Sequence, residues 1–258
     1  LRHGTDKFQR YTLNSKITAN ITDWLKVTLN SKWTREDFQR PTYLTSSFFH
    51  NLARKWPVHP AYDPNGFPMD EGEIEQMENG GEQNSQKDYY TNQLHVVIEP
   101  IKNWRINLEG SVRTTTQYQH WEVLPVYAYN VAGDPYYTVW DMGYGSYAAG
   151  SSRVNEYSWK ENYYTTNIYS DYFKQFDNGH YFKVMAGFNA ELYKTRNITA
   201  EKNTLITPGV PTINTATDDP QAYGGYADNS VAGFFARVNW SYKDRYMFEA
   251  NGRYDGSS

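Results

Sequence analysis

Apolar and polar residues alternate with a period of two along several stretches of the chain. In the segment that begins at Trp24, every second residue from Leu25 to Leu29 is apolar, and the residues between them are polar. Three further segments begin with an aromatic residue and alternate in the same way; they start at Trp104, Tyr181 and Tyr246. Because successive side chains of a strand point to opposite faces of a sheet, this period predicts strands with one apolar and one polar face.

Each of these strands follows a short polar turn and an earlier alternating segment. The turns are predicted at Thr22-Asp23, at 101–103, at 177–179 and at Lys243-Asp244. The earlier strands are predicted around 13–19, 93–99, 167–176 and 234–241, of which 167–176 alternates least clearly. Asparagine, aspartate and glycine tolerate the left-handed backbone that tight turns need. The pattern therefore predicts four antiparallel hairpins, or about eight strands.

The connections between the hairpins are long. They cover about 36–88, 117–157 and 200–229, contain several proline and glycine breakers, and show no helical period. A soluble β-sandwich, the first alternative, has connections of similar length at both ends. Outer-membrane barrels have short periplasmic turns and long external loops. We therefore predict an all-β, antiparallel transmembrane β-barrel segment, with the aromatic residues that begin the second strands near the periplasmic interface.

Composition limits the other classes of function. The mean hydropathy is -0.82 and no long apolar run occurs, which excludes transmembrane helices but not barrel strands, since only alternate residues of such strands are apolar. The net charge of -4 provides no basic footprint, so we expect no nucleic-acid partner. Cysteine is absent, which excludes disulfides and thiolate metal sites.

Aromatic residues make up 17% of the chain, and many lie in the long connections. There their rings could stack on a ligand, or they could pack the loops onto one another or onto a partner. The candidate ligand-binding residues are Trp56, Tyr62, Trp121, Trp140 and Tyr144. We leave both roles open for them.

Charged residues on the polar side of the strands form a second candidate set. We predict that they face a lumen, where they either line a passage or bond to a plug. These residues are Arg105, Glu109, Arg113, Lys183, Glu191, Glu249 and Arg253. No catalytic group, metal site or cofactor is expected: His50 and His59 fit no zinc spacing, and the turn at Asp63-Pro-Asn-Gly fails the spacing of a calcium loop. The chain is therefore not expected to be an enzyme.

The stretch 241–258, SYKDRYMFEANGRYDGSS, closely resembles a hairpin of the SusC/RagA-like TonB-dependent transporters of the Bacteroidota. The turns in 20–27 and 99–104 and the Asp63-Pro-Asn-Gly segment are similar to that family as well. The resemblance covers essentially the whole chain, 1–258, as barrel alone. It implies an internal fragment of a TonB-dependent receptor barrel of about 22 strands, whose plug, TonB box, N-terminal domain and remaining strands are not included.

The resemblance also implies a function. It implies a bacterial outer-membrane protein that imports a nutrient, with an oligosaccharide favoured over a peptide, under the drive of the TonB–ExbB–ExbD complex. A SusD-like surface lipoprotein would act as a lid, and outer-membrane lipid would surround the barrel. A self-contained eight-stranded barrel that serves as an adhesin or a structural protein is the alternative.

Overall fold

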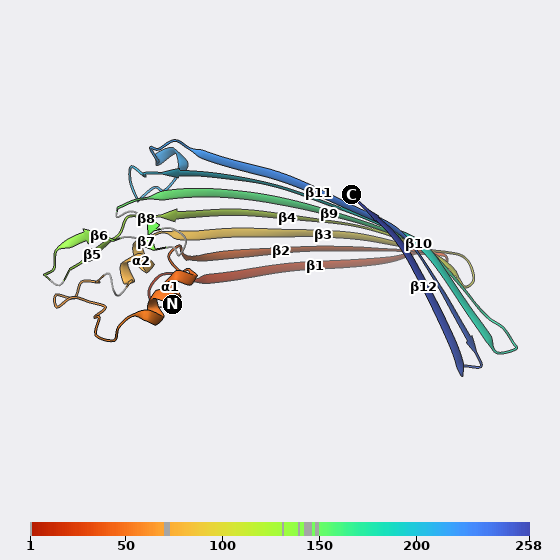
Figure 1. Ribbon diagram of the computed structural model, residues 1–258. Coiled ribbons are helices and arrows are strands. Elements are labelled where there is room, and N and C mark those ends of the chain that lie inside the picture. The colour runs from red at the N-terminus through yellow and green to blue at the C-terminus, as the bar shows by residue number, and fades with distance from the viewer. Residues whose placement is uncertain (1, 70–72, 131, 139, 142–145, 148–149) are drawn as a thin grey trace.

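Eight long antiparallel strands form one sheet in the computed structural model, which describes residues 2–69, 73–130, 132–138, 140–141, 146–147 and 150–258 (Figure 1). Every neighbour in the sheet is also the next long strand along the chain. The strands are β1 (Lys7–Thr22), β2 (Leu25–Pro41), β3 (Glu82–Ile101), β4 (Trp104–Val123), β9 (Arg153–Gln175), β10 (His180–Asn203), β11 (Gln221–Tyr242) and β12 (Tyr246–Ser257). The prediction of four hairpins is confirmed.

The hairpin turns lie at or next to the predicted positions. The turn between β3 and β4 consists of Lys102 and Asn103, and Asn103 adopts a left-handed backbone with φ 72°. Gly179 and Asp244 also have positive φ, 86° and 52°. Left-handed residues fit tight hairpin turns, and glycine, asparagine and aspartate adopt this conformation at low cost.

The strands are much longer than the sequence pattern predicted. They range from 16 residues in β1 to 24 residues in β10, apart from the shorter β12. The predicted bounds of the long connections were therefore wrong, and the connections shrink to 42–81, 124–152 and 204–220. Hydropathy misses the outer parts of the strands because both of their faces are polar, whereas the backbone ladder continues through them without a shift.

The connections contain short elements that gather at one end of the sheet (Figure 1). These are α1 (Ser46–Arg54), α2 (Ile74–Asn79), β5 (Tyr127–Tyr129) paired with β6 (Pro135–Tyr137), β7 (Trp140–Asp141) paired with β8 (Ser146–Tyr147), and the 3-10 turn η2 (Ile213–Thr215). The two helices lie in the first connection, where the sequence shows no helical period. Helix α1 begins after Thr45, whose hydroxyl accepts the N–H of Phe48 and satisfies a free donor of the first turn.

No helix in the described ranges is long and apolar enough to cross a membrane.

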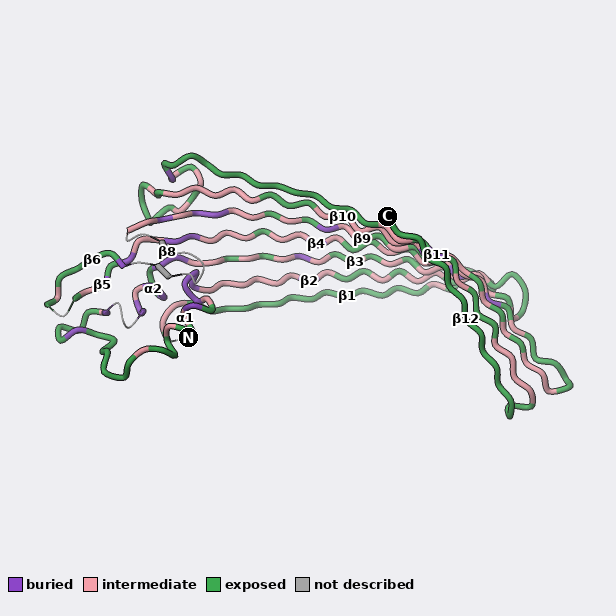
Figure 2. Tube along the Cα trace, viewed as in Figure 1, coloured by how far each residue is buried: buried purple, intermediate pink, exposed green. Residues whose placement is uncertain are grey.

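A small hydrophobic core lies at this loop end. Tyr43, Leu44, Met77 and Val123 are buried together, and Phe48 and Trp121 pack against them. Backbone hydrogen bonds from Thr42 to Gly81 and from Leu124 to Gly80 hold the first and second connections to the ends of the strands. Figure 2 shows buried segments concentrated near this end, whereas long stretches of the strands are half-buried or exposed.

The apolar side chains of the sheet lie on its more exposed face and the polar side chains on its more buried face. The register places an unbroken apolar row across all the long strands: Ala19, Val27, Val96, Leu108, Ile168, Phe188, Phe234 and Tyr254. In that row Ile168 is 45% exposed and Phe234 65%, whereas Asn107 and Asn189 on the opposite face are 6% and 7% exposed. A soluble sheet has the reverse arrangement, with its apolar face covered. The apolar face therefore needs an apolar environment that this chain does not itself provide.

Candidate functional site

The polar face of the sheet carries all of the charged residues that were predicted to face a lumen. The register places them on the side opposite the apolar row, because each alternates with an apolar-face neighbour such as Leu108, Val184 or Phe248. They are Arg105, Glu109, Arg113, Lys183, Glu191, Glu249 and Arg253. Their shared face follows from the period of two. That this face encloses a lumen stays a prediction.

Near the short turns, a buried carboxylate lies between two cations. Arg105 Nη2 is 2.8 Å from Asp171 Oδ2, and Lys183 Nζ is 3.8 Å from the same oxygen. Asp171 is only 4% exposed. Removal of the arginine would leave the poorly solvated carboxylate without its main partner, whereas Arg105 and Lys183 themselves remain partly solvated; the group links β4, β9 and β10.

Farther from the turns, charged and tyrosine side chains are linked across β4, β9 and β10. Arg113 Nη2 is 3.1 Å from Glu161 Oε1, and its guanidinium lies 5.1 Å from the centre of the Tyr163 ring. The hydroxyl of Tyr163 donates to Glu191 on β10. These contacts form a ladder across three strands in which each charge has a partner of the opposite sign or a hydrogen-bond donor.

The same pairing extends to both sides of the ladder. Glu109 accepts from the Tyr169 hydroxyl at 3.4 Å and lies 3.6 Å from His95 Nε2. Near the β12 edge, Glu249 accepts from Asn251 at 2.8 Å, and Arg253 Nε donates to Asp255 at 2.7 Å. The face is thus densely polar with its charges largely paired, which suits hydrogen bonding to a polar solute or to another protein surface.

Of the candidate aromatic residues, the three whose side chains the structure describes, Trp56, Tyr62 and Trp121, do not contact one another. Trp56 is 70% exposed and stacks on His59 with ring centres 6.4 Å apart, and Tyr62 is 43% exposed. Trp121 packs against the hydrophobic core at the loop end instead. Trp140 lies in the short strand β7, and Tyr144 falls outside the described residues.

Other loop aromatics pack on one another. The rings of Tyr127 and Tyr137 stack 4.2 Å apart, and those of Phe67 and Tyr129 stack 4.6 Å apart, which joins the first connection to the second. Packing between loops is thus observed for Phe67 and Tyr129, whereas Tyr127 and Tyr137 pack within one connection.

Asp63 has a structural role in its turn. Its Oδ1 accepts the backbone N–H groups of Asn65 at 2.9 Å and Phe67 at 2.7 Å, and the residue is 5% exposed. Bonds of this kind are typical of aspartate-stabilised turns. Within the part of the chain that the structure describes, no group of three or more acidic or histidine side chains is placed to hold a metal ion.

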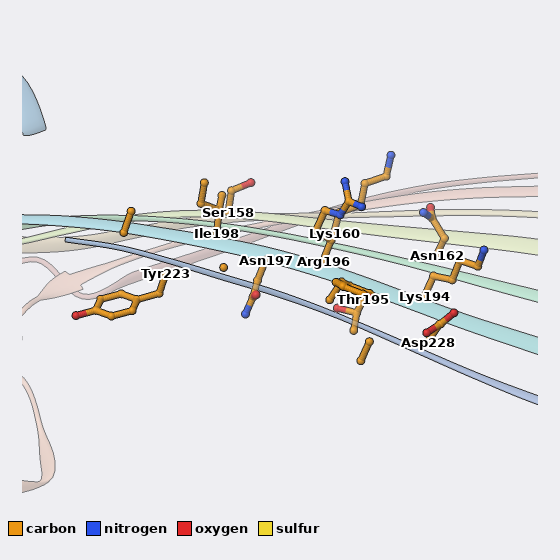
Figure 3. A pocket seen from close by; sticks show the side chains of 14 residues that line it. Ser158, Lys160, Asn162, Lys194, Thr195, Arg196, Asn197, Ile198, Tyr223 and Asp228 are labelled. Atoms are coloured by element: carbon orange, nitrogen blue, oxygen red, sulfur yellow. The ribbon is translucent and has the colours of Figure 1, made fainter. Parts of the chain in front are cut away.

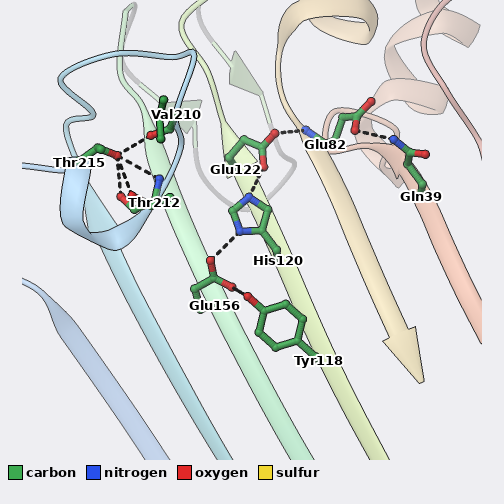
Figure 4. A network of polar contacts seen from close by, with 9 residues as sticks. All are labelled: Gln39, Glu82, Tyr118, His120, Glu122, Glu156, Val210, Thr212 and Thr215. Atoms are coloured by element: carbon green, nitrogen blue, oxygen red, sulfur yellow. Dashed lines mark hydrogen bonds and ion pairs between the residues drawn. The ribbon is translucent and has the colours of Figure 1, made fainter. Parts of the chain in front are cut away.

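The structure reveals a polar network that the sequence analysis missed (Figure 4). His120 Nε2 lies 2.6 Å from Glu122, and its Nδ1 lies 2.7 Å from Glu156 on β9. These two carboxylates, Glu122 foremost, raise the pKa of His120 to about 9. The hydroxyl of Tyr118 donates to Glu156, which raises the pKa of Tyr118 to about 12.

This network lies on the same face as the apolar row but closer to the loop end, where β4 and β9 have become polar on both sides. It was missed because 117–157 was assigned to a loop. No period of two marks this stretch as a strand, because polar side chains lie on both of its faces.

Comparison with solved structures identifies the fold. The chain is similar to the RagAB peptide transporter (TM-score 0.75, 15% identity) and to the RagAB peptide importer in its open-open state (0.78, 16%) and its closed-closed state (0.72, 16%). Each match covers 98% of this chain and 28% of the other. No family model and no curated protein matches the sequence. The chain therefore has the fold of a segment of the RagAB importer, which confirms at the level of fold the predicted resemblance to SusC/RagA-like transporters.

Proposed function

We propose that the eight strands form part of the wall of an outer-membrane barrel that imports a nutrient. The observation that carries this proposal is the distribution of side chains on the sheet: an apolar row lies half-buried or exposed across every strand, while polar residues pair on the other face. Lipid covers such an apolar face, and a polar lumen accommodates such a polar face.

The height of the apolar band supports the membrane assignment. On β3, apolar and aromatic side chains dominate this face from Ile98 to Tyr90, and on β10 from Phe182 to Leu192. At about 3.4 Å per residue these segments measure about 27 and 34 Å along the strand. A strand tilt of about 40° reduces them to about 21 and 26 Å, close to the apolar band of about 25 Å in outer-membrane barrels.

The proposal includes further strands beside these. In the described residues, β1 and β12 are the edges of an open sheet and do not pair with each other. An open edge in lipid would leave backbone groups without partners, so strands from elsewhere in the protein must complete the wall. The open sheet, together with the 28% coverage of the matched chains, favours a barrel of about 22 strands with a plug over a self-contained eight-stranded adhesin.

The ligand and the partners belong to the same proposal. The solved neighbours are peptide importers, whereas the exposed rings of Trp56 and Tyr62 would equally stack on sugars. We therefore propose a polar nutrient, either an oligosaccharide or a peptide. A SusD-like lipoprotein would cover the loop end, and the TonB–ExbB–ExbD complex would supply energy through parts outside this chain. No catalytic step is required.

Deletion of the gene tests the function. Loss of growth on a defined oligosaccharide or peptide as sole nutrient, restored by the wild-type gene, would support import and identify the ligand class. Detection of the native protein in the outer-membrane fraction, with a gel mobility that changes on boiling, would support the barrel. Normal growth on every substrate together with lost surface attachment would favour the adhesin instead.

A further inference from the structure

Three cationic side chains form a cluster on the apolar-row face, just beyond the apolar band. Lys160 on β9 lies directly opposite Arg196 on β10, and Lys194 is two residues from Arg196 on the same face. All three are exposed. Figure 3 shows Lys160, Arg196 and Lys194 on one side of the strands, with Thr195, Asn197 and Tyr223 on the other.

The cluster has no matching acidic cluster. In the same row, Arg35 forms two hydrogen bonds with Asp88, at 2.8 and 2.9 Å. Across the described ranges, no carboxylate forms an ion pair with Lys160, Lys194 or Arg196, although Asp228 is the cross-strand partner of Lys194. Like charges directly opposite each other on a sheet are destabilising, so an external anion would stabilise this arrangement.

The depth of the cluster restricts what that anion can be. Asn162 and Lys194 form the row next to Tyr164 and Leu192, the last row of the apolar band on these strands. The cations therefore begin at the boundary between hydrocarbon and headgroups. They border an open groove of about 900 Å³ that is also lined by residues of β11, Tyr223 and Tyr226 among them.

We propose that Lys160, Lys194 and Arg196 bind the phosphate of a lipid headgroup in the leaflet nearest the long loops. This inference rests on the proposed membrane function, since it requires lipid against the apolar row. Arginine binds phosphate through two parallel N–H groups, and lysine adds a point charge. Basic clusters at this depth are attracted to anionic headgroups.

The test uses the whole protein, purified in mixed micelles that contain equal amounts of phosphatidic acid and phosphatidylcholine. The lipid that remains bound after gel filtration is quantified by native mass spectrometry. We expect the wild type to retain phosphatidic acid in roughly tenfold preference, and Lys160→Gln/Lys194→Gln/Arg196→Gln to retain both lipids about equally. The matched control Lys7→Gln/Lys102→Gln/Lys202→Gln removes the same charge away from the cluster and should behave as the wild type.

Each outcome decides the inference. An unchanged lipid preference in the triple variant overturns it, and so does complete displacement by inorganic phosphate, which would indicate a free-anion site. If the triple variant does not assemble, Lys194→Gln alone should still lower the preference relative to Lys202→Gln. A wild-type protein that never reaches the membrane would overturn the proposed function as well, whereas normal assembly without lipid preference would overturn only this inference.

Discussion

Replacement of Leu94 with arginine would place a charge in the middle of the apolar band. Leu94 is 46% exposed on the apolar face of β3, midway between Ile98 near the short turn and Tyr90 at the opposite boundary. Each boundary is about 14 Å away along the strand, or about 10 Å in depth at a tilt of about 40°. At that depth the guanidinium remains within hydrocarbon.

The expected cost follows from this depth. Arginine near the midplane of a barrel's lipid face destabilises it by about 2–4 kcal/mol. At about 1.4 kcal/mol per tenfold change, the folding equilibrium should shift by a factor of about 30 to 700. The whole protein, unfolded by urea in lipid vesicles, should show a lower midpoint and a smaller heat-modifiable fraction.

Gln93→Arg is the matched control. Gln93 is the neighbouring residue on the same strand, half-buried on the polar face, where Asn30 and Ser111 are its cross-strand partners. Arginine there should change the free energy of unfolding by less than about 1 kcal/mol, as is usual away from sites of packing or paired charge. Equal effects at positions 93 and 94 would refute the assignment of lipid and lumen faces. Asn107 and Asn189 resemble suitable controls in the sequence, but both are buried and hydrogen-bonded in the structure.

Three further predictions concern the rest of the sheet. The pKa of His120 is raised from 6.5 to about 9, so the contribution of its charged form to stability should be complete below about pH 6.5 and be lost as the pH rises through about 9. Protease cleavage at the loop end should therefore increase over the same pH range. His120→Gln should remove this pH dependence. Gly187→Val should lower the free energy of unfolding, measured with urea, by about 1–3 kcal/mol, because a Cβ there would lie 2.5 Å from a ring atom of Phe235. Gly110→Val should leave it nearly unchanged, because no atom lies within 4 Å of the added Cβ. Trp121→Ala should speed proteolysis of the first connection while leaving the urea midpoint of the barrel unchanged, because its packing partners lie at the loop end.

Local pattern was enough to predict the hairpins but not the full length of the strands. The period of two marks a strand only where one face is apolar, as from Leu25 to Leu29. Beyond Trp33 both faces of β2 are polar, and the strand continues because its backbone pairs with β1 and β3. Helix α2, six residues long, depends on packing against the loop core, which no local period reports.

The candidate site shows the same division. The period was enough to place Arg105 and Lys183 on one face. Their shared partner Asp171 was not predicted, because pairing between residues far apart in sequence depends on the register of three strands. The contacts of the loop aromatics could not be predicted from the sequence either, because the contact between Phe67 and Tyr129 depends on the paths of two separate connections.

The extension of the strands beyond the apolar band separates the loops from the apolar surface of the sheet. On β2, the sheet continues from Trp33 to Pro41, which is about 27 Å of strand at 3.4 Å per residue. The connections begin only after this stretch, so their side chains can change without altering those that seal the bilayer. Changes in the loops, whether natural variants or grafted epitopes, should therefore leave the apolar band of the sheet intact.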